Sequence, residues 1–348
     1  MRAFLGWSAL LISLLLVAIT VVNPRQEFAG TRFPALALNT RRFKADLFDA
    51  RVKEAPPTGI IIGSSRSMNL PSGLFTSLTG ERFFNFGVFN ATIEDDLAVE
   101  RYTLHNDPSV RDIVVGVDPQ SFDGHIPQLP ELTHIARLQG ALDGTLGNPV
   151  SSTLLTLRPY RDALTVSYLA DVARSVLNAA HPPEAAYSFD SDGVLQYPKA
   201  DRARKTGSYD WPQHFRDCSA TQEAQYATYD SLATYKRAML DSLIAEATAK
   251  GVRVILWVPP LNPALDAAVH TKPVESANYD RVISYMRWLA RRPMVSFVDD
   301  IDPAKFPNSS GWYDCMHYDS INAVSIATSL ASAVRSANTR AAEAVAAR

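Results

Sequence analysis

The chain has 348 residues, of which 47% are hydrophobic and 20% charged, and its formal net charge is −2. This composition supplies enough apolar side chains for a full core and excludes an intrinsically disordered protein. The near-neutral charge argues against a nucleic-acid partner, and two cysteines are too few for a disulfide scaffold or a four-cysteine zinc site.

The first feature along the chain is an uncharged run from Ala3 to Val22. As a helix this run would span roughly 30 Å, the thickness of the hydrocarbon core of a bilayer. We expect an uncleaved membrane anchor over residues 1–22, because the run ends in a poor cleavage site; a cleaved signal peptide is the alternative. Arg2 favours an N-terminus inside the cell, although several arginines after the run count against export. We therefore expect a single-pass protein of the cell inner membrane with a periplasmic or extracellular soluble part.

A polar connector is expected over residues 23–57, followed by alternating strands and helices. Short apolar runs predict strands at 59–63, 82–86, 112–118, 253–258 and 295–298. Apolar spacing of three and four predicts a helix at 223–250, and Thr92 with Asp95 three residues on is typical of the N-cap of a helix that runs to about 106. Further helices are expected at 278–291 and from about 320, the last fraying over 339–348. This alternation predicts an α/β fold with a mainly parallel sheet.

Residues 124–222 interrupt this rhythm and are expected to form an insertion. The insertion either covers the carboxyl edge of the sheet, where ligands bind in such folds, or is an ordinary surface elaboration. Cys218 falls inside it, whereas Cys315 lies near the C-terminus. In an oxidising compartment these two cysteines can form a disulfide; two buried thiols are the alternative.

Two short motifs carry groups suited to nucleophilic catalysis. Gly63-Ser64-Ser65-Arg66 follows the first predicted strand, so a serine there would be exposed at the edge of the sheet. Asp314 and His317 are three residues apart, which lets the carboxylate orient the imidazole and stabilise its charged form. Each motif alone is weak, because tight turns and isolated histidines are common. A third element, from Asn85 to Thr92, is a turn that can point a backbone amide at an oxyanion.

The chain order of these three elements resembles the SGNH/GDSL hydrolase superfamily. The resemblance implies a flavodoxin-like three-layer sandwich over residues 58–338, with Ser65 as the nucleophile, His317 as its base and Asp314 as the acid. It also assigns the oxyanion hole to the amides of Ser65 and Asn90, with Gly87 shaping the turn. Ser64 stands where better-known members carry Asp, and the family's Gly-x-Asn-Asp block has no counterpart here.

Within that superfamily the chain looks more like a cell-envelope acylation branch, which includes DltD-like and alginate O-acetylation proteins. The resemblance implies a serine esterase or O-acyltransferase acting on an acylated polysaccharide or glycopolymer, beside a membrane-bound O-acyltransferase. No cofactor is implied, and no histidine or cysteine pair has convincing metal-ligand spacing. The missing block leaves a second interpretation open, a catalytically degenerate glycan-binding or scaffold protein. An α/β-hydrolase fits less well, because Ser67 occupies the final glycine of its Gly-x-Ser-x-Gly motif.

Three further residues are assigned to substrate binding. Arg66 can hold a carboxylate or phosphate, and the alternative is an ion pair that stiffens the turn. Asp118 lies where the missing block would be. Trp312, next to the Asp314 motif, can offer a stacking surface for a sugar.

Overall fold

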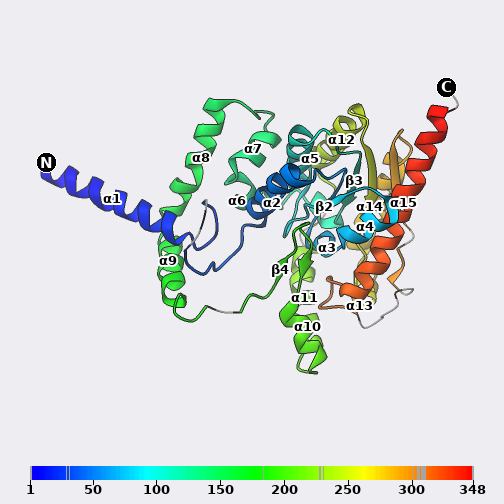
Figure 1. Ribbon diagram of the computed structural model, residues 1–348. Helices are drawn as coiled ribbons and strands as arrows, with labels where there is room; N and C mark the ends of the chain where they lie inside the picture. Colours follow the sequence, from blue (N-terminus) through cyan, green and yellow to red (C-terminus); the bar gives the residue numbers. More distant parts are fainter. Residues whose placement is uncertain are drawn as a thin grey trace. The chain divides into compact units, whose positions relative to one another are not determined.

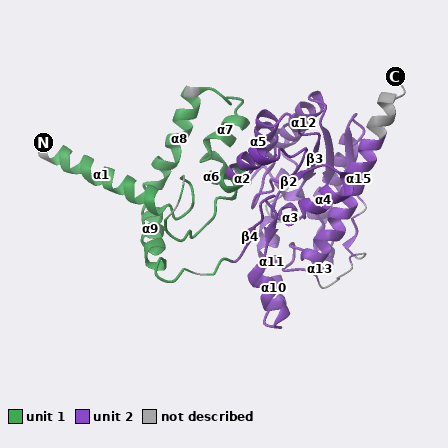
Figure 2. Cartoon of the chain, viewed as in Figure 1, with its two compact units in different colours: residues 1–45, 129–185 green, residues 46–128, 186–348 purple. Residues whose placement is uncertain are grey.

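The computed structural model describes residues 2–28, 30, 32–182, 184–226, 229, 231–299, 301–303, 306 and 311–346 (Figure 1). The chain forms two compact units, coloured separately in Figure 2. The first combines Met1–Ala45 with Leu129–Ala185, and the second combines Asp46–Gln128 with Ala186–Arg348. Helix α2 (Thr40–Glu54) begins in the first unit and ends in the second.

Within its described residues the first unit contains helices and no strands. Its helices are α1 (Arg2–Val22), α6 (Pro130–Thr133), α7 (Ala136–Leu142), α8 (Pro149–Ala163) and α9 (Val166–Asn178). The end of α1 takes part in its core, because Ile19 is buried against Phe28, Ala163 and Tyr168. Between Phe4 and Val17, α1 exposes a long series of apolar side chains, and Phe4–Val22 is apolar enough to cross a membrane.

This unit changes two of the predicted boundaries. The predicted connector 23–57 contains α2, a mostly polar helix that buries Ala45 and Phe48. The predicted insertion 124–222 is divided, because 129–185 belongs with the N-terminal segment and 186–222 with the sheet. The cause is the packing of Ile19 on α8 and α9, a contact between distant segments that no local pattern reveals.

The second unit is built on a five-stranded sheet. Its strands are β1 (Gly59–Gly63), β2 (Phe83–Asn85), β3 (Asp112–Gly116), β6 (Arg253–Trp257) and β7 (Val295–Val298). Their order is β2-β1-β3-β6-β7, and every neighbouring pair is parallel. This confirms the predicted α/β class. Counted along this sheet alone the order is 2-1-3-4-5, so the direction of winding reverses at β1 and β3, where such sheets bind ligands.

Helices cover both faces of this sheet because both faces of the strands are apolar. Ile61, Val114 and Ile255 share one face and pack with α4 (Ser72–Thr79) and α15 (Ser320–Ala346). The strands also contact α5 (Ile93–Asn106), α12 (Thr234–Ala249) and α14 (Pro273–Leu289). The first turn of α5 is fixed by a capping box between Thr92 and Asp95, as its predicted start requires.

The remaining elements of the second unit are short or lie between strands. They are α3 (Ser65–Met68), η1 (Pro119–Phe122), β4 (Ser188–Phe189), β5 (Leu195–Gln196), α10 (Pro198–Lys205), α11 (Trp211–Tyr226) and α13 (Pro263–His270). The predicted helix 223–250 is wrong at its start, since α11 ends at Tyr226 and α12 begins at Thr234. Between them, Leu232 forms a bridge with Asp123, which takes the backbone out of a helical path. The C-terminal helix is longer than predicted and continues through Ala346.

Candidate active site

Ser65 begins α3, directly after β1, at the point where the winding of the sheet reverses. The chain turns sharply at Gly63, whose φ is +130°, and a Cβ there would lie 2.5 Å from the carbonyl oxygen of Gly116. Only glycine fits that close approach without strain. Ser64 caps the new helix, because its hydroxyl accepts a hydrogen bond from the backbone N–H of Arg66. The turn thus holds Ser65 at the carboxyl edge of the sheet.

His317 and Asp314 reach the same place from the other end of the chain. The Nε2 atom of His317 lies 2.8 Å from the hydroxyl oxygen of Ser65. Its Nδ1 atom lies 2.7 Å from Oδ2 of Asp314. The structure therefore brings together the three residues that the sequence assigns to catalysis, in the order serine, imidazole and carboxylate. A neutral His317 protonated on Nδ1 can accept the serine proton at Nε2.

The Asp314 carboxylate is held by more than the imidazole. Its Oδ1 atom accepts hydrogen bonds from the backbone N–H groups of Met316 and His317, each at 2.8 Å. Burial alone would raise the pKa of Asp314, but the charge and hydrogen bond of His317 and the two backbone donors outweigh burial and lower it. Asp314 is therefore ionised at neutral pH and can stabilise an imidazolium.

The loop that carries this pair is closed on itself by backbone hydrogen bonds. The N–H of Tyr313 donates to the carbonyl of His317 at 2.7 Å, and Trp312 forms an antiparallel bridge with Tyr318. Tyr318 also donates from its hydroxyl to the carbonyl of Arg66. Because Arg66 follows Ser65, this bond fastens the loop over residues 312–318, named the acid–base loop after Asp314 and His317, to the helix that begins at Ser65.

Asn85 is a positioning residue whose role the sequence did not reveal. Its amide nitrogen donates to the carbonyls of Ser67, Met68 and Leu70, at 2.8 to 3.1 Å. Its Oδ1 accepts from the N–H of Gly87 at 3.0 Å. Asn85 thereby links the end of the serine helix to the turn after β2. Its position in the turn motif is the one sequence signal that could have identified it.

The turn after β2 contains Gly87, which is predicted to shape the turn, and Asn90, whose amide is predicted to face the oxyanion. A Cβ on Gly87 would lie 3.0 Å from the Met68 side chain, so the tight turn favours glycine. The N–H of Gly87 is used by Asn85, which agrees with a shaping role. Asn90 is exposed and left-handed, with a φ of +51°.

Arg66 and Asp118 form a buried ion pair with each other. The Arg66 side chain is fully buried, and its Nη1 atom donates to the carbonyl of Pro259 at 2.9 Å. Both side chains are thus turned toward each other and away from solvent, which contradicts their predicted contact with substrate. The structure instead shows the ion pair that was the alternative for Arg66. It joins the segments that follow β1, β3 and β6, and thus stiffens the edge beside Ser65.

Trp312 is also absent from the surface. Its indole is fully buried in the core beneath α15, 6.1 Å from the ring of Tyr318. The predicted stacking of a sugar on Trp312 is thus wrong, because its large apolar surface is used for packing.

Cys218 of α11 and Cys315 are joined by a disulfide. Cys315 stands between Asp314 and His317 in the chain, so the bond fastens α11 to the acid–base loop. The two sulfurs and a carboxylate oxygen of Asp314 lie within 4.8 Å of one another. Since disulfide sulfurs are not thiolates, this cluster offers a metal one carboxylate and nothing more.

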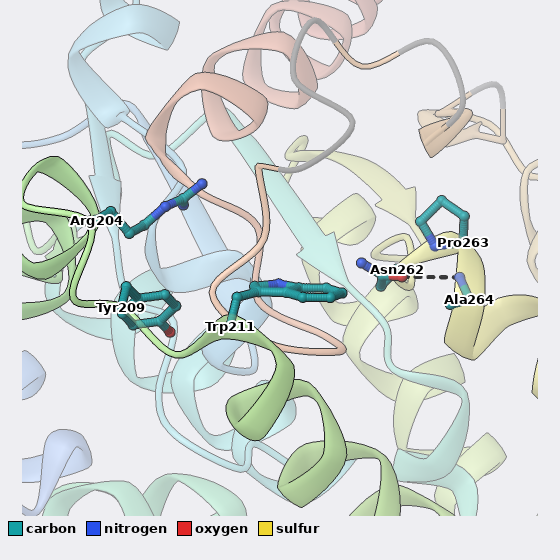
Figure 3. Close-up of a pocket in the computed structure, with 7 residues that line it drawn as sticks. Arg204, Tyr209, Trp211, Asn262, Pro263 and Ala264 are labelled. Carbon is teal, nitrogen blue, oxygen red and sulfur yellow. Dashed lines mark hydrogen bonds between the residues drawn. The ribbon is translucent and has the colours of Figure 1, made fainter.

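A pocket of about 660 Å³ opens beside this loop (Figure 3). Its lining residues are Arg204, Gly207, Tyr209, Trp211, Asn262, Pro263 and Ala264. Its walls come from α10, α11 and the segment after β6, which only the folded chain brings together. Neither the comparison with protein-family models nor the search of curated proteins finds a match to this chain.

Proposed function

We propose that this protein is a membrane-anchored, extracytoplasmic serine esterase or O-acyltransferase of the SGNH type. The observation that carries the proposal is the chain of contacts from the Ser65 hydroxyl through both nitrogens of His317 to the Asp314 carboxylate. A serine hydroxyl is a weak nucleophile unless a neighbouring base removes its proton, and here that base is in place and oriented. The 2-1-3-4-5 sheet order further supports the assignment.

The reaction follows from this geometry. Ser65 Oγ attacks the ester carbonyl while its proton moves to Nε2 of His317, and Asp314 stabilises the imidazolium. The amide N–H of Ser65, in the first turn of α3, and that of Asn90 stabilise the oxyanion. The tetrahedral intermediate then expels the alcohol, which takes the proton from Nε2, and leaves an acyl group on Ser65. Water or a sugar hydroxyl, activated by His317, releases that group.

The same proposal includes the substrate, the membrane anchor and a partner protein. We assign an acylated cell-envelope polysaccharide as substrate and α1 as an anchor in the inner membrane, with a membrane-bound O-acyltransferase as partner. The apolar α1 supports the anchor, and the disulfide supports an oxidising compartment.

The test is hydrolysis of p-nitrophenyl acetate by the full chain in detergent. Ser65→Ala should lower kcat by about 10³-fold or more, as loss of a triad nucleophile does. Ser77→Ala, at an exposed serine of α4, is the matched control and should keep wild-type activity. Equal rates for wild type and Ser65→Ala would contradict the catalytic assignment.

One observation favours a second function, that of a non-catalytic glycan-binding or scaffold protein. Asp118, at the position where the family's side-chain oxyanion donor is expected, is occupied by its ion pair with Arg66. A fluorophosphonate that labels activated serines separates the two functions. Labelling that depends on Ser65 supports the enzyme; absence of labelling in a folded protein supports the scaffold.

A further inference from the structure

We infer that the pocket lined by Tyr209, Trp211 and Asn262 binds a pyranose ring of the ester substrate and so determines its specificity. This inference rests on the proposed function, because it places the alcohol side of the ester next to the acid–base loop.

Two residues that line the pocket are hydrogen-bonded to the loop that carries Asp314 and His317. The hydroxyl of Tyr209 donates to the carbonyl of Tyr313 at 2.6 Å. The N–H of Asn262 donates to the carbonyl of Cys315 at 3.1 Å. The negative charge of Asp314 also contributes to raising the pKa of Tyr209, after burial, to about 12. Two walls of the pocket are therefore attached to the loop that carries Asp314 and His317.

The chemistry of the walls selects the ligand. The lining residues given above combine two amphipathic aromatic rings with an amide and a guanidinium, and none of them is a branched aliphatic residue or phenylalanine. A pocket for a long acyl chain would be lined mainly by such apolar side chains. Tryptophan and tyrosine instead present an apolar face with a polar edge, which suits a flat ring that carries hydroxyl groups.

Trp211 is the central residue of this surface. Figure 3 draws its indole between Tyr209 and the amide of Asn262, whose Oδ1 accepts from the N–H of Ala264 at 2.9 Å. That bond turns the Asn262 amide nitrogen away from Ala264, where it can donate to a ligand. The indole N–H of Trp211 is buried and has no hydrogen-bond partner among the described residues. Because this nitrogen is buried, the part of Trp211 that lines the pocket is its ring, which suits stacking against a sugar.

The disulfide fixes this pocket relative to the catalytic pair. Trp211 is the first residue of α11, and Cys218 lies two turns further along the same helix. Because Cys218 is bonded to Cys315, the helix that supplies the aromatic ring cannot move independently of the loop that supplies the base.

Binding is tested first without catalysis, in the Ser65→Ala background. The probe is methyl 6-O-acetyl-glucopyranoside, titrated into full-length protein in detergent by calorimetry. Trp211→Ala should weaken binding about five- to tenfold, the loss expected for one aromatic contact. Trp288→Ala, at an exposed tryptophan of α14, is the matched control and should bind as the background does. Unchanged binding in folded Trp211→Ala overturns the inference.

Kinetics in the active protein supply the second test. Trp211→Ala should raise KM for the sugar ester while kcat/KM for p-nitrophenyl acetate stays within about twofold of wild type. Ala264→Trp places a bulky side chain in the pocket from an exposed position and should give the same split, so the test survives if Trp211→Ala does not fold. An equal loss on both substrates overturns the inference, because the pocket would then serve the acyl side. Activity that persists in Ser65→Ala contradicts the proposed function, while the binding data still decide on the pocket.

Discussion

Asp314 uses its two carboxylate oxygens for two different purposes. Oδ1 shapes the loop by accepting two backbone N–H groups, and Oδ2 orients the imidazole of His317. The side chain is therefore needed both for the fold of the loop and for the tautomer of the base, and its replacement should affect stability and rate in separable ways.

Asp314→Asn separates these two effects. The asparagine oxygen can still accept hydrogen bonds from the backbone amides, but its NH₂ cannot accept a hydrogen bond from the N–H at Nδ1 of His317. We expect kcat for p-nitrophenyl acetate to fall about 10³- to 10⁴-fold, as loss of the orienting carboxylate does in serine hydrolases. A fall of less than tenfold would show that His317 is oriented by other groups.

The pH dependence of stability follows from the lowered pKa of Asp314. A carboxylate with a folded-state pKa below its unfolded value of 3.8 adds stability above that value and loses it as the pH falls through the folded pKa. The difference in unfolding free energy between wild type and Asp314→Asn should therefore be largest near neutral pH and shrink below about pH 4. Urea unfolding at several pH values measures it, and a difference that grows toward acid would contradict the assignment.

Arg66 and Asp118 illustrate the cost of burying a charge. A buried charge of either residue without its partner would strongly destabilise the fold, but the two opposite charges neutralise each other beside Ser65. Asp118→Leu should lower the unfolding free energy by about 3–5 kcal/mol, because it strands the Arg66 charge. The double replacement Arg66→Met with Asp118→Leu should recover much of that loss in urea unfolding. If the single variant instead folds normally and raises KM, these residues bind substrate after all.

At the scale of elements, the sheet was predictable and the connections were not. Apolar runs such as Ile60-Ile61-Ile62 identify buried strands, and the motifs at their ends place Ser65 correctly. The burial of Trp312 could not be predicted, because the sequence beside the Asp314 motif is the same whether the aromatic ring is buried or exposed. Pairings across the chain, such as Arg66 with Asp118 or Ile19 with Tyr168, leave no local periodicity and appear only when the elements pack.

The disulfide between α11 and the acid–base loop is the covalent connection at this scale. It closes a loop of 97 residues, and a loop of that length gives about 2–5 kcal/mol of stabilisation. Reduction should lower both the melting temperature and kcat, because Cys315 lies between Asp314 and His317, the proposed acid and base. The Cys218→Ser, Cys315→Ser variant is the control and should be less stable than wild type but unaffected by reductant. A wild type unaffected by verified reduction would show that the loop is held by its hydrogen bonds alone.

At the scale of the whole molecule, α1 is both an exposed apolar helix and part of a folded unit. Arg25, just after α1, bonds Asp171 of α9 at 2.7 Å, and His134 lies 3.0 Å from both Glu27 and Asp162. Together with buried Ile19, these contacts tie the end of α1 to the first unit. Cleavage at Val22 would remove Ile19 from that core, which favours an uncleaved anchor over a cleaved signal peptide.

This argument predicts that two isoleucines of α1 respond differently to the same change. Ile19→Asn places a polar side chain in the core of the first unit, whereas Ile12→Asn changes an exposed position of the same apolar run. In detergent, Ile19→Asn should cost about 2–4 kcal/mol and accelerate proteolysis of residues 129–185, while Ile12→Asn should leave proteolysis unchanged. Intact mass of protein extracted from membranes should include residues 3–22. A mature chain that begins after Val22, with the first unit still resistant to protease, would show that α1 is a signal peptide and that the unit folds without it.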